Sequence, residues 1–149
     1  MTWLAALLSL AQWLSPVPGS AVSAGYLPPV RIGAPGHRGV DLAAPPGTPV
    51  SAIGPGVVAV AGIVAGKPVV TIVHAQSGVR STYEPVVAAV IRGQSVRAGE
   101  SIGVLASAGG HCGGHCLHLG IRDLRTGDYR DPGTLTTLPL VVLKPVSRG

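Results

Sequence analysis

The 149-residue sequence is poor in charged and aromatic residues. It contains no Phe, and Asp, Glu, Lys and Arg together make up 11% of it, against about a quarter in an ordinary soluble domain. Disorder driven by charge is excluded, because 46% of the residues are hydrophobic and can form a core. A nucleic-acid-binding protein is also disfavoured despite the net charge of +5, since the sequence has no Lys/Arg cluster and almost no aromatic residues for stacking.

Glycine and proline are abundant instead, with 22 Gly and 14 Pro. They interrupt the chain every few residues and so exclude a long helical bundle, while the lack of a three-residue Gly period excludes collagen. Short apolar or alternating runs recur between these turn signals, which predicts an all-β domain with an antiparallel sheet or sandwich and long loops. The expected strands are 48–53, 57–64, 68–74, 79–83, 86–92, 101–105 and 116–122, followed by one helical turn after Asp131.

The first 30 residues carry no charge. An apolar run over 3–14 is shorter than the roughly 20 residues of a membrane span, and Val22-Ser23-Ala24 offers small residues before a cleavage point. We therefore predict a signal peptide over 1–24, although the usual basic start is missing, and a Pro-rich arm over 25–32. The protein is then secreted and cell-wall associated, with no membrane span. The alternatives are a wrongly assigned start or a core helix of an intracellular protein.

Two cysteines, Cys112 and Cys116, lie in a Gly-rich loop. In an oxidising compartment this spacing suits a small loop-closing disulfide. A zinc knot formed by both cysteines with His115 and His118 is the competing interpretation. The basic charge of an exported chain also makes anionic wall polymers a candidate partner.

Histidine and aspartate gather in two segments. His37 and Asp41 are four residues apart around Gly39, and His118 lies on the predicted strand 116–122. A catalytic zinc takes three protein ligands of this kind plus water, so these three residues are candidate metal ligands. His74 ends a predicted strand and is expected to be a packed or rim histidine.

Together these segments resemble the lysostaphin/LytM-type zinc metallopeptidases, which cut peptide bonds in bacterial peptidoglycan. The resemblance spans about residues 33–138 and follows the exported actinobacterial branch of the family. It implies a LytM domain of the duplicated-hybrid-motif type over 33–138, a tail over 139–149 and a Zn²⁺ cofactor. It rests on an ordered series of motifs: His37-Arg38-Gly39-Val40-Asp41-Leu42, Gly47-Thr48-Pro49-Val50, Gly54-Pro55-Gly56-Val57-Val58, Val69-Val70-Thr71-Ile72-Val73-His74, Tyr83, Val96-Arg97-Ala98-Gly99-Glu100-Ser101-Ile102-Gly103, Leu117-His118-Leu119-Gly120-Ile121-Arg122 and Asp131-Pro132.

The resemblance implies that His37, Asp41 and His118 are the zinc ligands. Two assisting histidines of the family are replaced here: Cys116 stands at the first His of the H-x-H motif, and Glu84 stands where a His follows Tyr83. As an enzyme, the chain would use Glu84 as the base and His111 or His115 as the oxyanion donor.

Two other functions compete with a peptidase. A catalytically degenerate module would bind peptidoglycan peptide or regulate a partner hydrolase. A biotinyl or lipoyl carrier barrel is similar in part, but neither Lys67 nor Lys144 has the context of a carrier lysine. The sequence gives no oligomeric state and does not say which peptidoglycan bond would be cut.

Overall fold

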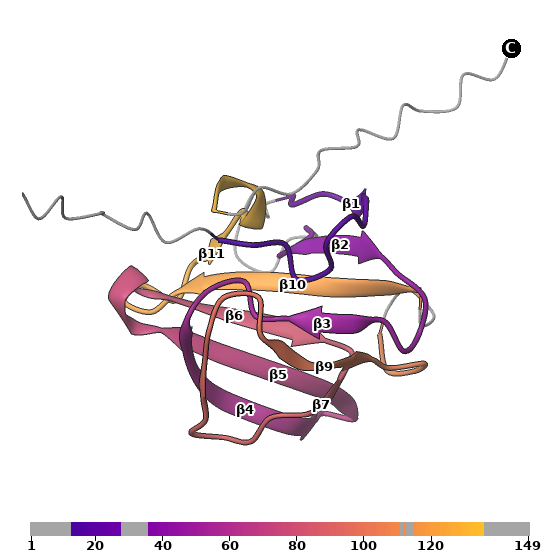
Figure 1. The fold of residues 1–149 in the computed structure, drawn as a ribbon. Helices are drawn as coiled ribbons and strands as arrows, with labels where there is room; N and C mark the ends of the chain where they lie inside the picture. Colours follow the sequence, from indigo (N-terminus) through magenta and orange to yellow (C-terminus); the bar gives the residue numbers. More distant parts are fainter. Residues whose placement is uncertain (1–12, 28–35, 111, 113–114, 136–149) are drawn as a thin grey trace, which may run out of the picture.

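The computed structural model describes residues 13–27, 36–110, 112 and 115–135, which form two antiparallel sheets (Figure 1). The larger sheet has the strand order β1-β2-β10-β6-β5-β4-β8, with β11 paired to β10 as its eighth strand. The smaller sheet has the order β3-β9-β7. The prediction of an all-β antiparallel fold is confirmed.

The bounds of the elements follow the turn signals closely. The larger sheet consists of β1 (Val22–Ala24), β2 (Val40–Ala43), β4 (Gly56–Val64), β5 (Lys67–His74), β6 (Val79–Glu84), β8 (Ser95–Val96), β10 (Cys116–Asp123) and β11 (Tyr129–Arg130). The smaller sheet consists of β3 (Pro49–Ser51), β7 (Val86–Ala88) and β9 (Ser101–Leu105). Two 3-10 turns cover Ala75–Ser77 and Pro132–Thr134, so the helical turn expected after Asp131 is present.

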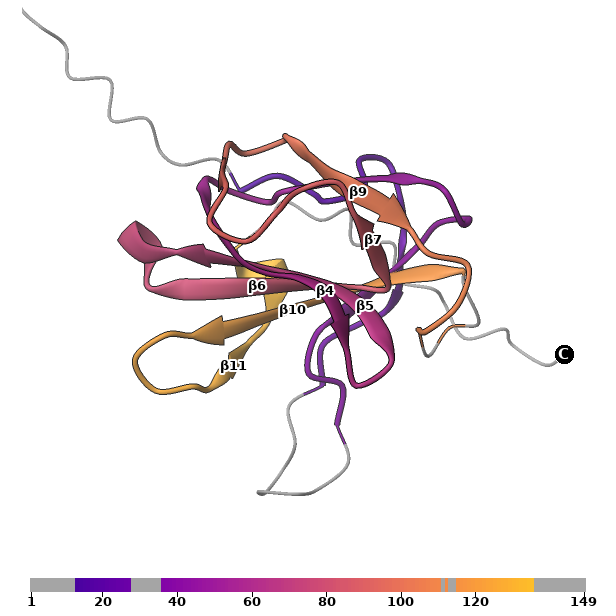
Figure 2. The same cartoon turned by 90° about the horizontal axis from the view of Figure 1, so that it is seen from below.

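Alternating side chains give the larger sheet two different faces. Successive residues of a strand point to opposite sides, and on β10 Leu117, Leu119 and Ile121 are fully buried. The smaller sheet lies over one face of the larger one (Figure 2), and the apolar core fills the space between them. The opposite face of β4, β5, β6 and β10 is left to line a groove.

One expected strand is clearly shorter in the structure, and four observed strands were not expected. The predicted strand 86–92 ends early, because the chain turns after β7 and the amide of Gly93 donates to the carbonyl of Val58. The unexpected strands are β1, β2, β8 and β11. The sequence of β2 contains Asp41, a residue type depleted in strands, and this explains why pattern analysis missed it.

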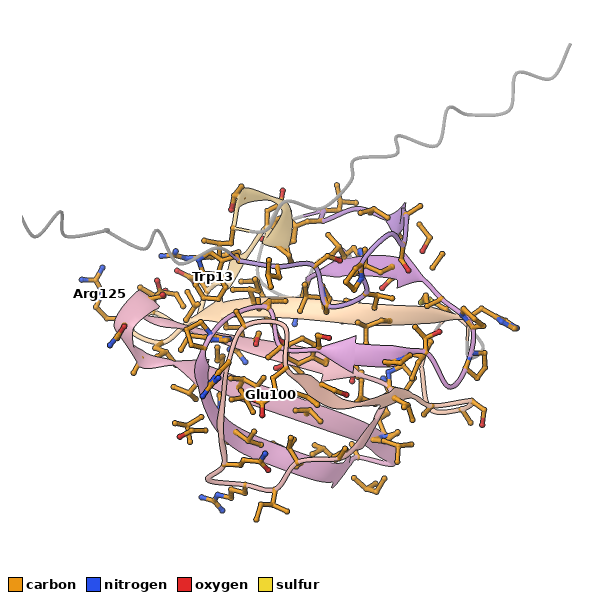
Figure 3. All side chains as sticks on the ribbon, in the orientation of Figure 1. Trp13, Glu100 and Arg125 are labelled. Carbon is orange, nitrogen blue, oxygen red and sulfur yellow. A yellow bond between two sulfur atoms is a disulfide. The ribbon has the colours of Figure 1, made fainter. Side chains whose placement is uncertain are left out.

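The segment before the predicted cleavage point packs onto the domain. Val17 is 3% exposed within the core, the Trp13 and His74 ring centroids lie 4.9 Å apart, and the Leu14 amide donates to the Ile53 carbonyl. Figure 3 labels Trp13 against the folded body of the chain. The packed unit therefore begins before residue 33, and cleavage ahead of Gly25 stays a prediction. No helix in the described segments is long and apolar enough to cross a membrane.

His74 lies in a buried polar network and is 2% exposed. Its Nδ1 lies 2.8 Å from the Pro55 carbonyl and its Nε2 lies 2.7 Å from the Ser81 hydroxyl. That hydroxyl lies 2.9 Å from the Tyr83 hydroxyl, which accepts the Ile53 amide. Burial lowers the pKa of His74 and raises that of Tyr83 beyond its ordinary range. The expectation of a packed histidine holds.

Removing the N-terminal segment tests its structural role. A chain starting at residue 25 should unfold at lower urea concentration than one starting at residue 13, because it loses β1 and the buried Val17 side chain, worth about 1.5–3 kcal/mol alone. Val17→Ala in the longer chain should reproduce part of this loss. Equal stability of the two chains would show that residues 13–24 do not belong to the folded unit.

The buried His74 makes stability dependent on pH. Its folded pKa lies below the 6.5 of the unfolded chain, so its contribution is complete above pH 6.5 and is lost as the pH falls below that value toward the folded pKa. With a chelator present, the free energy of unfolding should fall by up to about 1.4 kcal/mol per pH unit from this group. His74→Asn, which cannot titrate, should show a shallower slope between pH 7 and 5. Identical slopes would contradict the prediction.

Candidate metal centre and groove

Three side chains with metal-binding or proton-transfer chemistry lie in one row across three strands. In the register of the larger sheet, His118 on β10 is opposite Asp41 on β2 and opposite Glu84 on β6. Directly opposite residues in antiparallel strands have Cβ atoms about 4.5–5.5 Å apart. Pairing of β10 with both neighbours therefore brings residues 34 and 77 positions apart in sequence into one site.

Asp41 connects the two histidines through one oxygen. Its Oδ1 lies 3.2 Å from His37 Nε2 and 2.8 Å from His118 Nδ1, and the two imidazole centroids are 5.0 Å apart. The carboxylate side chain is 6% exposed, while those of His37 and His118 are 23% and 16% exposed. The cluster is thus largely sheltered but open to solvent on the histidine side.

A backbone carbonyl fixes the protonation of His37. The Gly25 carbonyl can only accept, and it lies 2.7 Å from His37 Nδ1, so Nδ1 carries the hydrogen. In the neutral ring Nε2 then presents its lone pair to Asp41 Oδ1, which is also an acceptor. Two acceptors at this distance need a proton or a metal ion between them.

The donor set fits zinc. His nitrogen and carboxylate oxygen are ordinary zinc ligands, and atoms bound at about 2.0–2.1 Å in a tetrahedron lie roughly 3.3 Å apart. His37 Nε2 and Asp41 Oδ1 lie 3.2 Å apart, and one ligand atom from each of His37, Asp41 and His118 falls within 4.8 Å of the others. A hydrogen bond from the non-ligating nitrogen to a carbonyl, as His37 makes to Gly25, is the usual outer support of a metal-bound histidine.

Gly39 is required by close packing between the two ligand segments. A Cβ at this position would lie 2.7 Å from His118 Nε2 and would collide with the carbonyl of Leu119. The chain bends at Gly39, between His37 and Asp41. Its φ is not among the positive values found at other glycines, so the close packing, and not the backbone conformation, requires glycine here.

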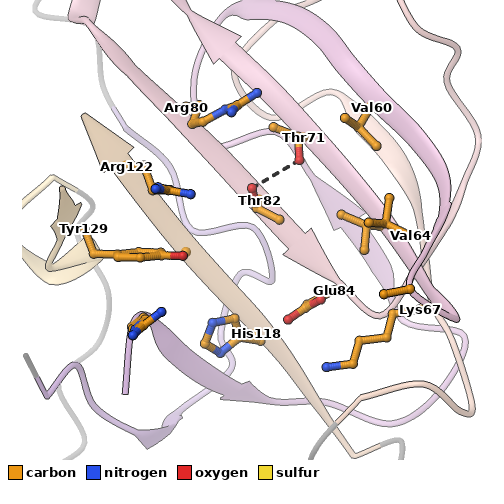
Figure 4. Close-up of a pocket in the computed structure, with 14 residues that line it drawn as sticks. Val60, Val64, Lys67, Thr71, Arg80, Thr82, Glu84, His118, Arg122 and Tyr129 are labelled. Atoms are coloured by element: carbon orange, nitrogen blue, oxygen red, sulfur yellow. Dashed lines mark hydrogen bonds between the residues drawn. The ribbon is translucent and has the colours of Figure 1, made fainter. Parts of the chain in front are cut away.

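The predicted assisting residues do not all reach the cluster. Glu84 lines the groove beside His118 (Figure 4) and its carboxylate has no hydrogen bond or ion pair within the described residues. His115 is exposed, and its side chain makes no hydrogen bond in the described part of the chain. His111 lies outside the described residues.

The cysteines form a disulfide. Cys112 and Cys116 are bonded with their Cα atoms 5.6 Å apart, within the ordinary range for such a bridge. Because a metal ligand must be a thiolate, the disulfide form argues against the zinc knot. It also leaves Cys116 unable to replace the family's assisting histidine, although the sulfurs lie beside Asp41.

A groove of about 550 Å³ lies on the open face of the sheet, and His118 and Glu84 of this row line it. Its floor combines apolar and hydroxyl side chains with four cations and a single acid, Glu84. The cations are Arg38, Lys67, Arg80 and Arg122. None of them has an ion pair with a carboxylate in the described segments. Pattern analysis of the sequence missed these cations because they come from four separate segments.

Fold and site place the chain in a class of all-β domains with a His–Asp–His cluster next to a groove that His118 also lines. Residues 35–132 match Peptidase family M23, and the chain belongs to this family. M23 peptidases are zinc-dependent and typically extracytoplasmic cell-wall enzymes. This chain is 49% identical over 119 residues to the uncharacterized protein Rv2891 of Mycobacterium tuberculosis. The alignment covers 76% of this chain and 46% of that protein. The chain thus spans about half the length of this relative.

Solved structures show the same fold. The catalytic domain of the antimicrobial peptidase lysostaphin from Staphylococcus simulans is similar with a TM-score of 0.65 and 27% identity, covering 77% of this chain and 90% of that domain. Helicobacter pylori Csd3 is similar with a TM-score of 0.68 and 25% identity, covering 85% of this chain and 35% of Csd3. The fold of this chain is therefore that of the lysostaphin-type peptidases.

Substitution of Gly39 tests the packing of the cluster. Gly39→Ala should lower zinc affinity by tenfold or more, since the added methyl group displaces the His118 ring and losses at supporting residues are commonly 10–100-fold. Gly62→Ala is the matched control, because a Cβ there meets nothing within 4 Å. Competition with a zinc-sensitive dye measures both affinities. Equal affinities would show that Gly39 does not hold the ligands in place.

Proposed function

We propose that this chain is a zinc-dependent endopeptidase domain that hydrolyses peptide bonds in the cross-links or stem peptides of peptidoglycan. The observation that carries the proposal is the convergence of His37 and His118 on one oxygen of Asp41, with His118 also lining the groove. Membership of Peptidase family M23 supports the same reaction class and substrate.

In this proposal His37, Asp41 and His118 hold the zinc ion. When bound, zinc polarises the scissile carbonyl and lowers the pKa of water. Asp41 keeps both rings oriented, and the Gly25 carbonyl holds His37 in the tautomer that leaves Nε2 available.

Glu84 is proposed as the general base. Its position opposite His118 supports this role, because both side chains line the groove and the carboxylate can contact a water molecule held there beside His118. The carboxylate takes one proton from the attacking water, and the same proton is then delivered to the amine that leaves as the C–N bond breaks. The oxyanion donor has no assignment among the described residues, and His111 remains the candidate for it.

A second function is favoured by one specific observation. The disulfide occupies Cys116, where the family has an assisting histidine. Loss of one oxyanion donor alone commonly reduces the rate 10²–10³-fold. The alternative is therefore a degenerate module that binds peptidoglycan peptide or regulates a partner hydrolase from a secreted, wall-associated position.

Amine release from purified peptidoglycan separates the two functions. The oxidised protein should release new amino groups with zinc and none with a chelator. His118→Ala should lose both bound zinc and activity, whereas Glu84→Gln should keep zinc and lose at least 10²-fold in rate, as for other positioned bases. Glu100→Gln, a change at an exposed acid on the opposite side of the sheet (Figure 3), is the matched control.

Three results would contradict parts of the proposal. Unchanged zinc content in His118→Ala would remove that residue from the ligand set, and an unaffected rate in Glu84→Gln would remove it as the base. No amine release from peptidoglycan that is nevertheless bound would establish the degenerate module.

A further inference from the structure

Two arginines that line the groove occupy directly opposed positions on neighbouring strands. Arg80 on β6 is the register partner of Arg122 on β10, and both line the groove (Figure 4). Like charges directly opposite each other in a sheet are destabilising. Nothing in the described residues neutralises this pair, because the nearest acid in sequence, Asp123, accepts Arg130 and two turn amides instead.

One atom of this pair is buried and lacks a partner in the described part of the chain. Arg80 Nε has almost no solvent exposure and no hydrogen-bond partner there, which costs free energy unless a ligand supplies an acceptor. Two contacts fix the Arg122 side chain. Its Nε donates to the Gly127 carbonyl, and its guanidinium lies 4.7 Å from the centre of the Tyr129 ring. A fixed arginine beside an unsatisfied one is a suitable arrangement for an anion with two oxygens.

The surroundings indicate which anion. Lys67 and Arg38 add positive charge to the same groove, whereas Val60, Val64 and Val69 give it an apolar wall. An organic ligand that carries a carboxylate fits this lining better than an inorganic anion, because its carbon atoms can contact the valine side chains. The groove is also continuous with the row that contains His118 and Glu84.

We propose that Arg80 and Arg122 form a subsite for a free carboxylate carried by the peptide substrate. Four residues separate each arginine from the row of His118 and Glu84, and at about 3.3 Å per residue the two rows lie roughly 13 Å apart along the strands. An extended peptide spans that distance in about four residues. The chain therefore selects peptides with a carboxylate side chain or branch about four residues from the bond at the metal end, and this assignment rests on the proposed function.

Binding of paired synthetic peptides tests the subsite without requiring cleavage. The probes are acetylated, amidated octapeptides of Ala and Gly that carry one Glu, or one Gln, at a central position. Affinities are measured by calorimetry on the full chain with a chelator and 150 mM salt, which screens long-range attraction. The Glu peptide should bind about tenfold more tightly than the Gln peptide, as expected for a charge-assisted contact.

Variants identify the groups responsible. Arg80→Gln and Arg122→Gln should each reduce the preference to about twofold or less, while Arg125→Gln, an equal change of charge at an exposed turn (Figure 3), should leave it intact. Thermal unfolding of each variant confirms that the fold is retained. Two independent arginine variants keep the test valid if one of them fails to fold.

Three outcomes would overturn the subsite: equal binding of the two peptides, an equal loss in Arg125→Gln, or displacement of the Glu peptide by inorganic phosphate at lower concentration than by acetate. The last result would point to a phosphate-bearing wall polymer. Failure of the proposed peptidase is distinguishable, because a carboxylate preference that depends on Arg80 and persists without any peptide hydrolysis contradicts only the enzyme.

Discussion

The register of β10 between β2 and β6 is the constraint on which the site depends. It places His118 opposite Asp41 on one side and opposite Glu84 on the other. A slip of one residue would turn every side chain of β10 to the other face, burying His118 and exposing Leu117 and Leu119. The apolar residues of β10 therefore determine the position of His118 in the His–Asp–His cluster as well as the packing of the core.

The same alternation gives the two faces of the larger sheet different roles. On β6, Ser81 and Tyr83 face the core and join the buried His74 network, whereas Arg80, Thr82 and Glu84 face the groove. Packing on the buried face stabilises the fold, so the groove face can keep groups that are unfavourable by themselves. In the described part of the chain, these groups are the Glu84 carboxylate, the opposed Arg80 and Arg122, and the Arg80 Nε without a hydrogen-bond partner.

The sequence predicted the fold class, most of the long strands and the metal candidates, since these depend on alternation and on rare residue types at fixed spacing. It could not predict that β2 forms around Asp41, because a buried acid contradicts strand preference until its two histidine partners are known. The hydrogen bond from His37 Nδ1 to the Gly25 carbonyl could not be predicted from the sequence either, because every residue has a backbone carbonyl. The cationic groove depends on strand order, which joins Lys67 to Arg122 only through β5, β6 and β10.

The position of Glu84 bears on the choice between a peptidase and a binding module. A groove that only held an anionic peptide would gain affinity by having cations throughout, and an acid in it would repel the ligand. Among the described residues that line this groove, Glu84 is the acid, and it stands opposite His118 although Lys67 lies beside it (Figure 4). Retention of an anionic peptide gives no reason for an acid at that position. The proposed hydrolysis does, because it needs a proton acceptor next to the candidate metal ligands.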